Sequence, residues 1–130
     1  MAFRLLHTMI RVRDLETSIA FYVDLLGMSL LRKSDHPQGR FTLAFLGYGE
    51  EKDTSVLELT YNWDRKEPYA LGEGYGHMAI AVPDIHAACA ALAKAGAKVT
   101  DEPFVLPGGS ATIAFIEDPD GYPIELIERE

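Results

Sequence analysis

The stretch HTMIRVRDL at residues 7–15 returns as HMAIAVPDI at residues 77–85, with His, Ile, Val and Asp at the same offsets. Each stretch begins as a strand-like apolar run and is followed by a run with helical spacing or a high alanine content, residues 15–26 and 85–95. Asp14 and Asp84 are predicted N-caps, because their carboxylates can accept from free amides of the first turn. The repeat predicts a chain built of two similar halves.

Strand-like runs follow each predicted helix, separated by turn sequences rich in Gly, Pro and Asp. We expect an α+β fold made of two tandem βαβββ modules that form curved mixed sheets. The whole chain, 1–130, is interpreted as one domain, with module 1 at 1–62, a linker at 63–74 and module 2 at 75–130. The predicted strands after the helices are 28–32, 41–47 and 55–61 in the first half, and 98–100, 111–117 and 123–127 in the second.

Composition limits the classes of partner. The chain has 130 residues, 48% hydrophobic and 25% charged, and a net charge of −8 without any basic run. Nucleic-acid binding is therefore not expected, since it needs clustered Lys and Arg, and no apolar run has the roughly 20 residues needed to span a membrane. The N-terminus shows no signal-peptide pattern and Cys89 is the single cysteine, so we expect a cytoplasmic protein.

Four side chains with metal-ligand chemistry occupy repeated positions. His7 and His77 lie in the first predicted strand of each half, and Glu58 and Glu125 lie in the last. A carboxylate within an apolar strand needs a partner if it is buried, and two imidazoles with two carboxylates suit Ni, Co, Zn, Fe or Mn. A single strand Glu or His more often faces solvent or is purely structural. The repetition in both halves favours the metal site, whereas His36 and His86 are expected at the surface.

Several motifs resemble glyoxalase I of the short bacterial, nickel- or cobalt-activated type, within the vicinal-oxygen-chelate superfamily. The segments ELTYNW and HTM are the most specific to that family, and DPDGY is shared by the whole superfamily. The matching stretches are RLLHTM (4–9), SIAFY (18–22), LGM (26–28), LAFLGYG (43–49), ELTYNW (58–63), YGH (75–77), AFIEDPDGY (114–122) and IELI (124–127). The resemblance covers nearly the whole chain.

The resemblance implies a site and a reaction. The metal ligands would be His7, Glu58, His77 and Glu125, with one divalent metal per site, Ni²⁺ first, Co²⁺ possible and Zn²⁺ as the alternative. The family forms homodimers whose active sites lie between chains. The implied activity is that of a lactoylglutathione lyase, a carbon–sulfur lyase of methylglyoxal detoxification. It isomerises the methylglyoxal–glutathione hemithioacetal to S-lactoylglutathione through an ene-diolate.

Within that reaction, the family suggests that Glu125 is the catalytic base, with Glu58 serving the other stereoisomer. Arg11 and Asn62 match positions that contact glutathione, whereas Glu73 stands where some relatives have an arginine. Two other functions remain open: another metal enzyme of the superfamily, such as an epimerase or an extradiol dioxygenase, and a metal-free drug-binding protein. The fold alone cannot separate them, and the repeated His and Glu positions favour the lyase.

Overall fold

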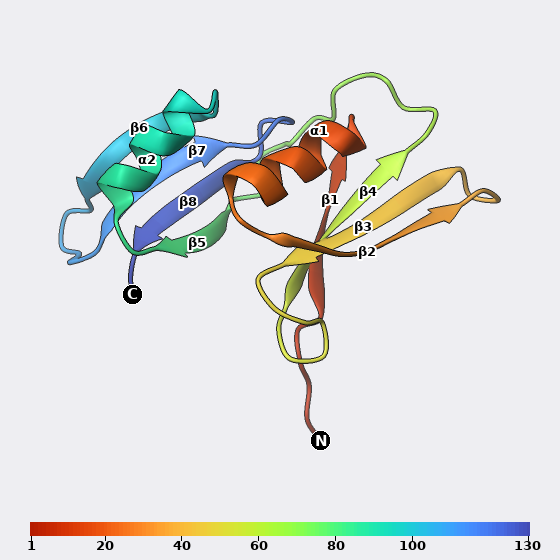
Figure 1. Ribbon diagram of the computed structural model, residues 1–130, viewed down its shortest axis with the longest axis horizontal. Helices are drawn as coiled ribbons and strands as arrows, with labels where there is room; N and C mark the ends of the chain where they lie inside the picture. The colour runs from red at the N-terminus through yellow and green to blue at the C-terminus, as the bar shows by residue number, and fades with distance from the viewer. The chain divides into compact units, whose positions relative to one another are not determined.

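The computed structural model describes residues 1–130 and divides into two compact units, residues 1–69 and 70–130 (Figure 1). The division falls within the segment 63–74 that the sequence analysis interprets as a linker. Neither helical segment is both long and apolar enough to cross a membrane.

The first unit contains one four-stranded mixed sheet and one helical segment. In the sheet the strand order is β1-β4-β3-β2; β1 and β4 are parallel, and the other neighbours are antiparallel. Its elements are β1 (His7–Val12), α1 (Leu15–Ala20), the π-helical turn η1 (Phe21–Leu25), β2 (Ser29–His36), β3 (Phe41–Gly47) and β4 (Val56–Asn62).

The second unit repeats this topology strand for strand. Its sheet has the order β5-β8-β7-β6, again with a parallel pair, β5 and β8, at one side. The predicted fold class, α+β with two βαβββ modules and mixed sheets, is confirmed. The elements are β5 (Met78–Val82), α2 (Ile85–Lys94), β6 (Lys98–Val105), β7 (Thr112–Glu117) and β8 (Pro123–Glu128).

Both helical segments begin and end as the sequence predicts. Asp14 accepts a hydrogen bond from the Thr17 amide, and Asp84 accepts one from the Ala87 amide, each at 3.1 Å. Gly27 and Gly96 follow the last turns with φ of 74° and 96°, the left-handed conformation that glycine adopts without steric cost. The first strand of each unit is thereby followed by a helical segment of fixed length that returns the chain to its sheet.

The predicted helix 15–26 differs from an ordinary α-helix in its second half. After Ala20 the chain widens into the π-helical turn η1, in which the Leu26 amide donates to the Phe21 carbonyl at 3.2 Å. Phe21 and Tyr22 are both buried in this turn, so two adjacent aromatic rings enter the core. Periodicity alone does not distinguish this turn from a regular helix.

Strand β6 is longer than the sequence analysis predicts. We expected a strand at 98–100, but β6 extends through Pro103 to Val105. β6 is an edge strand of its sheet, where a proline need not donate to a neighbour. Register shifts at Val99/Asp101 and Asp101/Phe104 take up the irregularity.

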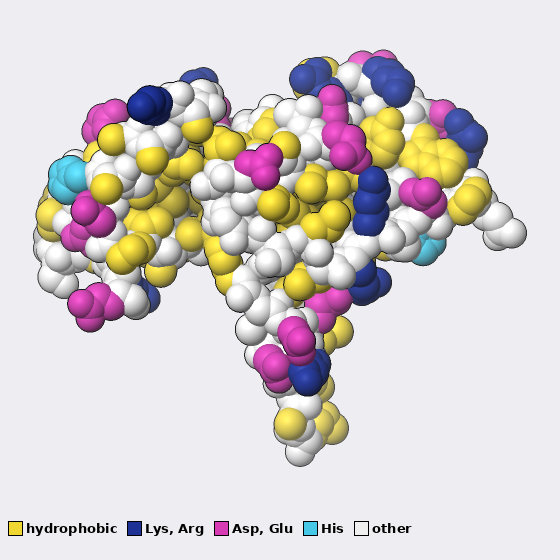
Figure 2. Space-filling model, in the orientation of Figure 1, with side chains coloured by type: hydrophobic (Ala, Val, Ile, Leu, Met, Phe, Trp, Pro, Cys, Tyr) yellow, Lys and Arg dark blue, Asp and Glu magenta, His cyan; other side chains and the backbone are white.

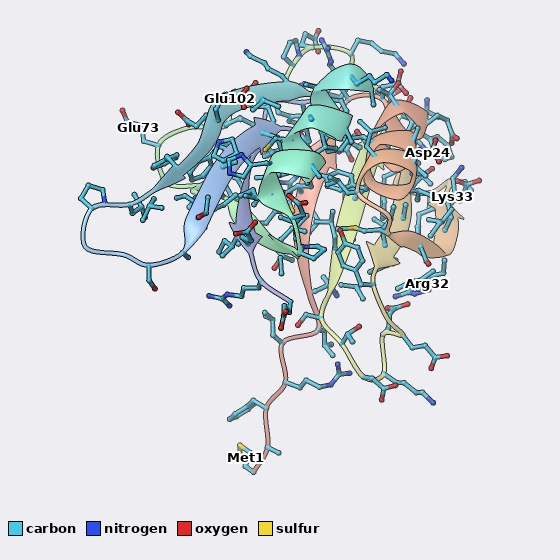
Figure 3. The ribbon with its side chains drawn as sticks, turned by 60° about the vertical axis from the view of Figure 1, so that its left-hand side comes forward. Met1, Asp24, Arg32, Lys33, Glu73 and Glu102 are labelled. Atoms are coloured by element: carbon cyan, nitrogen blue, oxygen red, sulfur yellow. The ribbon has the colours of Figure 1, made fainter.

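Each sheet has one face that packs in the core and one face that is more exposed. In β8 the fully buried Ile124 and Leu126 alternate with the half-buried Glu125 and Ile127. In the first unit the consecutive residues Arg32 and Lys33, labelled in Figure 3, contact a β3 ring and the α1 residue Glu16 respectively. Because neighbours along a strand point to opposite faces, the face that carries Glu58 is the one that α1 leaves uncovered.

Candidate metal centre

His7 and Glu58 meet on the uncovered face of the first sheet, and we call this pair half-site 1. β1 and β4 are parallel neighbours, with Met9 paired to Glu58, so the His7 side chain reaches across to the carboxylate. His7 Nε2 lies 2.9 Å from Glu58 Oε1. The carboxylate is nearly buried, and its Oε2 accepts from the Thr60 hydroxyl at 3.3 Å.

His77 and Glu125 form the equivalent pair in the second unit, half-site 2. His77 Nε2 lies 3.2 Å from Glu125 Oε1. The prediction that His77 lies within the first strand is off by one residue: β5 begins at Met78, and His77 immediately precedes it. In both half-sites the histidine is more exposed than its glutamate, with side-chain exposures of 38% and 11% in half-site 1 and 41% and 15% in half-site 2.

Each histidine ring also packs against a phenylalanine that the sequence analysis missed. The ring of Phe45 on β3 lies 5.5 Å from that of His7 at 79°, and the ring of Phe115 on β7 lies 5.3 Å from that of His77 at 84°. Such edge-to-face contacts fix the orientation of both rings. A signal was available, since the two phenylalanines are separated by the same number of residues as the two histidines.

The histidine and glutamate of each half-site could bind one metal cation together. An imidazole nitrogen and a carboxylate oxygen about 3 Å apart can form a hydrogen bond, or both can ligate one borderline divalent metal. Each half-site supplies two such donors, and neither belongs to a cluster of three or more His, Cys, Asp or Glu side chains that could hold a metal ion. A half-site alone therefore offers an incomplete ligand set.

The two predicted substrate contacts lie on the face of half-site 1. Arg11 is exposed on β1, two pleats beyond His7 and paired with Thr60. Asn62 ends β4, opposite Phe41, and its Nδ2 donates to the Tyr69 hydroxyl at 3.0 Å. Glu73, also labelled in Figure 3, is exposed in the second unit. Arg11 and Asn62 thus extend the polar surface beside Glu58.

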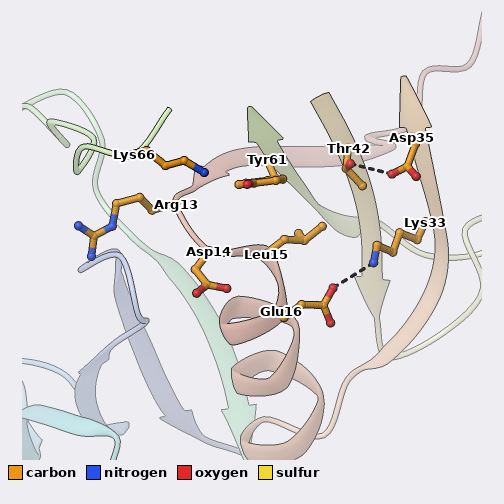
Figure 4. Close-up of a pocket in the computed structure, with 9 residues that line it drawn as sticks. All are labelled: Arg13, Asp14, Leu15, Glu16, Lys33, Asp35, Thr42, Tyr61 and Lys66. Carbon is orange, nitrogen blue, oxygen red and sulfur yellow. Dashed lines mark hydrogen bonds and ion pairs between the residues drawn. The ribbon is translucent and has the colours of Figure 1, made fainter. Parts of the chain in front are cut away.

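A cavity of about 420 Å³ lies on the opposite, helix-bearing face of the first sheet (Figure 4). Several of its charged groups already have partners in the protein: Lys33 pairs with Glu16 at 3.0 Å, and Asp35 accepts from Thr42 at 2.7 Å. Asp14, which also lines it, caps α1. The cavity contains none of the four candidate ligands and is distinct from the half-sites.

The other two histidines differ in their surroundings. His86 is exposed on α2, as predicted. The prediction for His36 is wrong, because its ring is partly buried, stacks on Phe41 with centroids 4.7 Å apart, and lies 3.0 Å from the Ser34 hydroxyl. Strand β2 continues to His36, so this residue belongs to the sheet rather than to the turn.

Sequence comparison identifies the class of protein to which this fold and its repeated half-sites belong. Residues 4–126 match the model of the Glyoxalase/Bleomycin resistance protein/Dioxygenase superfamily, and the chain belongs to this family.

Close relatives carry a more particular name. A protein of Synechocystis named "Probable lactoylglutathione lyase" is 56% identical over 95% of this chain and 94% of its own. A Neisseria meningitidis protein named "Lactoylglutathione lyase" is 54% identical over 98% of this chain and 91% of its own.

Solved structures agree with the fold. Glyoxalase I from Zea mays superposes with a TM-score of 0.92 and 46% identity over 97% of this chain, which spans only 44% of the maize chain. The trypanothione-dependent glyoxalase I of Leishmania major gives a TM-score of 0.87 and 46% identity, over 98% of this chain and 87% of its own.

Proposed function

We propose that this chain is a lactoylglutathione lyase, which isomerises the hemithioacetal of methylglyoxal and glutathione to S-lactoylglutathione. Relatives of that name are more than half identical to it over nearly its full length. The observation that carries the proposal is the His–Glu pair at equivalent positions of both units. In this role the chain removes methylglyoxal.

We infer that His7, Glu58, His77 and Glu125 together hold one divalent metal ion. Two imidazoles and two carboxylates fit a borderline cation, and no thiolate is present to favour a structural zinc site. Ni²⁺ is our first choice and Co²⁺ our second, with Zn²⁺ as the alternative. When bound, the metal would stabilise, as a Lewis acid, negative charge on two neighbouring substrate oxygens.

We propose a homodimer in which each ligand set combines half-site 1 of one chain with half-site 2 of its partner. Support comes from the two donors of each half-site and from the apolar segment before β1, where Met1, Phe3, Leu5 and Leu6 are exposed. Figure 2 shows hydrophobic side chains at this end of the chain. We also propose that the two units of each chain act as one domain, since the dimer needs one unit of each kind to complete a ligand set.

The chemistry required of the protein is a proton transfer between adjacent carbons. The Glu125 carboxylate takes the proton from C1 of the hemithioacetal, leaving an ene-diolate, and returns it to C2. The hydroxyl proton passes from the C1 oxygen to the C2 oxygen, so the product is an isomer and no redox partner is needed. A positioned carboxylate can serve as both base and acid in these steps.

The contacts of the two glutamates favour Glu125 as this base. Glu58 is held by the Thr60 hydroxyl as well as by His7, whereas the residue two after Glu125 is Ile127, which has no hydroxyl to donate. Glu125 thus has one fewer tether and can move to the substrate more easily. We assign Glu58 the same role for the other stereoisomer of the hemithioacetal.

Arg11 and Asn62 are proposed glutathione contacts. A guanidinium binds a carboxylate in a fork geometry, and Arg11 presents one on the Glu58 face. We also propose a cytoplasmic location, supported by the free, buried thiol of Cys89 and by the thiol-based substrate.

Metal reconstitution tests the proposal. Protein stripped of metal is mixed with methylglyoxal and glutathione, thioester formation is followed in the ultraviolet, and Ni²⁺, Co²⁺, Zn²⁺ or Mn²⁺ is added in turn. We expect Ni²⁺ and Co²⁺ to restore turnover and Zn²⁺ to restore little. Best restoration by Zn²⁺ would overturn the metal choice only. A protein that binds metal but makes no thioester would overturn the lyase assignment.

A further inference from the structure

Arg32 on β2 lies on the same sheet face as half-site 1, since Arg32 pairs with Phe45 and Phe45 pairs with Glu58. Its guanidinium is fixed on two sides. The guanidinium carbon is 3.7 Å from the centroid of the Phe45 ring, a close cation–π contact. Its Nε and Nη2 donate to the two carboxylate oxygens of Glu51 at 2.7 and 3.1 Å. These hydrogen bonds raise the pKa of Arg32 and lower that of Glu51, so both groups stay charged.

Phe45 connects this ion pair to the candidate ligand. Its ring is almost fully buried, and it meets His7 edge-on. His7 Nε2 in turn lies 2.9 Å from Glu58 Oε1. A guanidinium that covers Phe45 restricts the tilt of that ring, and the ring restricts the rotation of the imidazole.

The second unit has the same contact between a phenylalanine and a histidine, but it has no counterpart of the arginine that covers Phe45. Phe115 meets His77 edge-on, as Phe45 meets His7. Both β2 and β6 carry a register shift just before the residue paired with the phenylalanine, Arg32 in one and Asp101 in the other. Asp101 cannot supply a cation, so only half-site 1 has this support.

We propose that Arg32, held by Glu51, is a positioning residue that orients the His7 ring through Phe45 and makes half-site 1 the more rigid of the two. Its consequence for metal binding rests on the proposed function. Its consequence for the ring of His7 does not, because the contacts that orient the ring, from Phe45 and through it from Arg32, lie within the chain itself. The rigid half-site then provides fixed ligands, while the less supported half-site 2 contains the glutamate that must move.

The first experiment observes the imidazoles directly. The full chain is labelled with ¹⁵N-histidine, and the ring signals of its four histidines are recorded without metal in the original protein and in Arg32→Gln. We expect the His7 ring signals to shift or broaden while those of His77 stay in place. Arg32→Lys, which keeps a cation over the ring, should restore most of the original spectrum.

Two further variants complete the experiment, one as a control and one as a second test. Arg40→Gln removes an arginine of the turn between β2 and β3, whose partners Asp64 and Trp63 follow the end of β4 that is remote from His7, and it should leave the His7 signals unchanged. Glu51→Gln removes the anchor but keeps the guanidinium, and it should reproduce the change at His7. Unchanged His7 signals in both Arg32→Gln and Glu51→Gln would overturn the proposal. If Arg32→Gln does not fold, Glu51→Gln decides alone.

Metal affinity separates this proposal from the proposed function. Residues that support a metal ligand typically change affinity by 10–100-fold, and we expect Arg32→Gln to weaken Ni²⁺ binding about tenfold, measured by competition with a chelator. Equal Ni²⁺ affinity of Arg32→Gln and Arg40→Gln would refute the role in metal binding. Failure of the original protein to bind Ni²⁺ would instead refute the metal site, while the His7 spectra would still decide the positioning role.

Discussion

Substitution of Glu125 by Gln tests the proposed role of this residue as a base separately from its proposed role as a metal ligand. The side chain is 15% exposed and touches His77 at 3.2 Å, a contact that an amide can keep. We therefore expect the free energy of unfolding to change by less than about 1 kcal/mol. Loss of a general base typically costs about 10²–10⁴-fold in rate, or roughly 3–5 kcal/mol of activation free energy.

The assay combines turnover, metal content and stability in one preparation. Thioester formation is followed with methylglyoxal and glutathione, bound metal is measured by elemental analysis, and unfolding is followed in denaturant. Glu117→Gln is the matched control: it makes the same change on the neighbouring strand β7, where Glu117 pairs with Lys98 at 3.4 Å, and it should retain turnover. Near-normal turnover of Glu125→Gln with its metal retained would refute the assignment of Glu125 as base.

Four further predictions follow from single residues. His77→Ala should lower the bound metal per chain by at least half, as measured by elemental analysis, because half-site 2 then keeps one donor. Leu59→Ala, at a fully buried position in the middle of β4, should cost about 2–5 kcal/mol in denaturant unfolding. Asp84→Ala removes the α2 cap and should cost about 1 kcal/mol by the same measurement. Burial raises the pKa of the Cys89 thiol, so less thiolate is present near pH 8.5 and iodoacetamide labelling, followed by mass spectrometry, should be slower than for an exposed cysteine.

The fold could be predicted because both halves carry the same local signals. Asp14 and Asp84 cap the helical segments, and Gly27 and Gly96 end them, as their chemistry requires. These features depend on a few neighbouring residues, which a sequence displays directly. The pairing of His7 with Glu58 could be anticipated only because the repeat places an equivalent pair in the second half.

The features that sequence reasoning missed depend on contacts between distant strands. Phe45, Arg32 and Glu51 come together through the pairing of β2 with β3 and through a loop, and no local pattern joins them. His36 was expected to be solvated because Pro37 follows it, whereas the strand persists through His36 and stacks it on Phe41. In both cases contacts between strands, and not neighbouring residues in the sequence, determine where the side chain lies.

The parallel pairing of β1 with β4 has a consequence for how the protein folds. His7 and Glu58 belong to the first and last strands of the first unit in sequence. Their contact therefore closes nearly the whole unit into one loop of the chain. Pairings between such distant segments are slow, because the chain loses entropy before it gains contacts. A slip of β4 by one residue would turn Glu58 to the helix-bearing face. Capture of a metal ion during refolding should therefore follow the last, slowest phase and report the molecules that have reached the correct alignment.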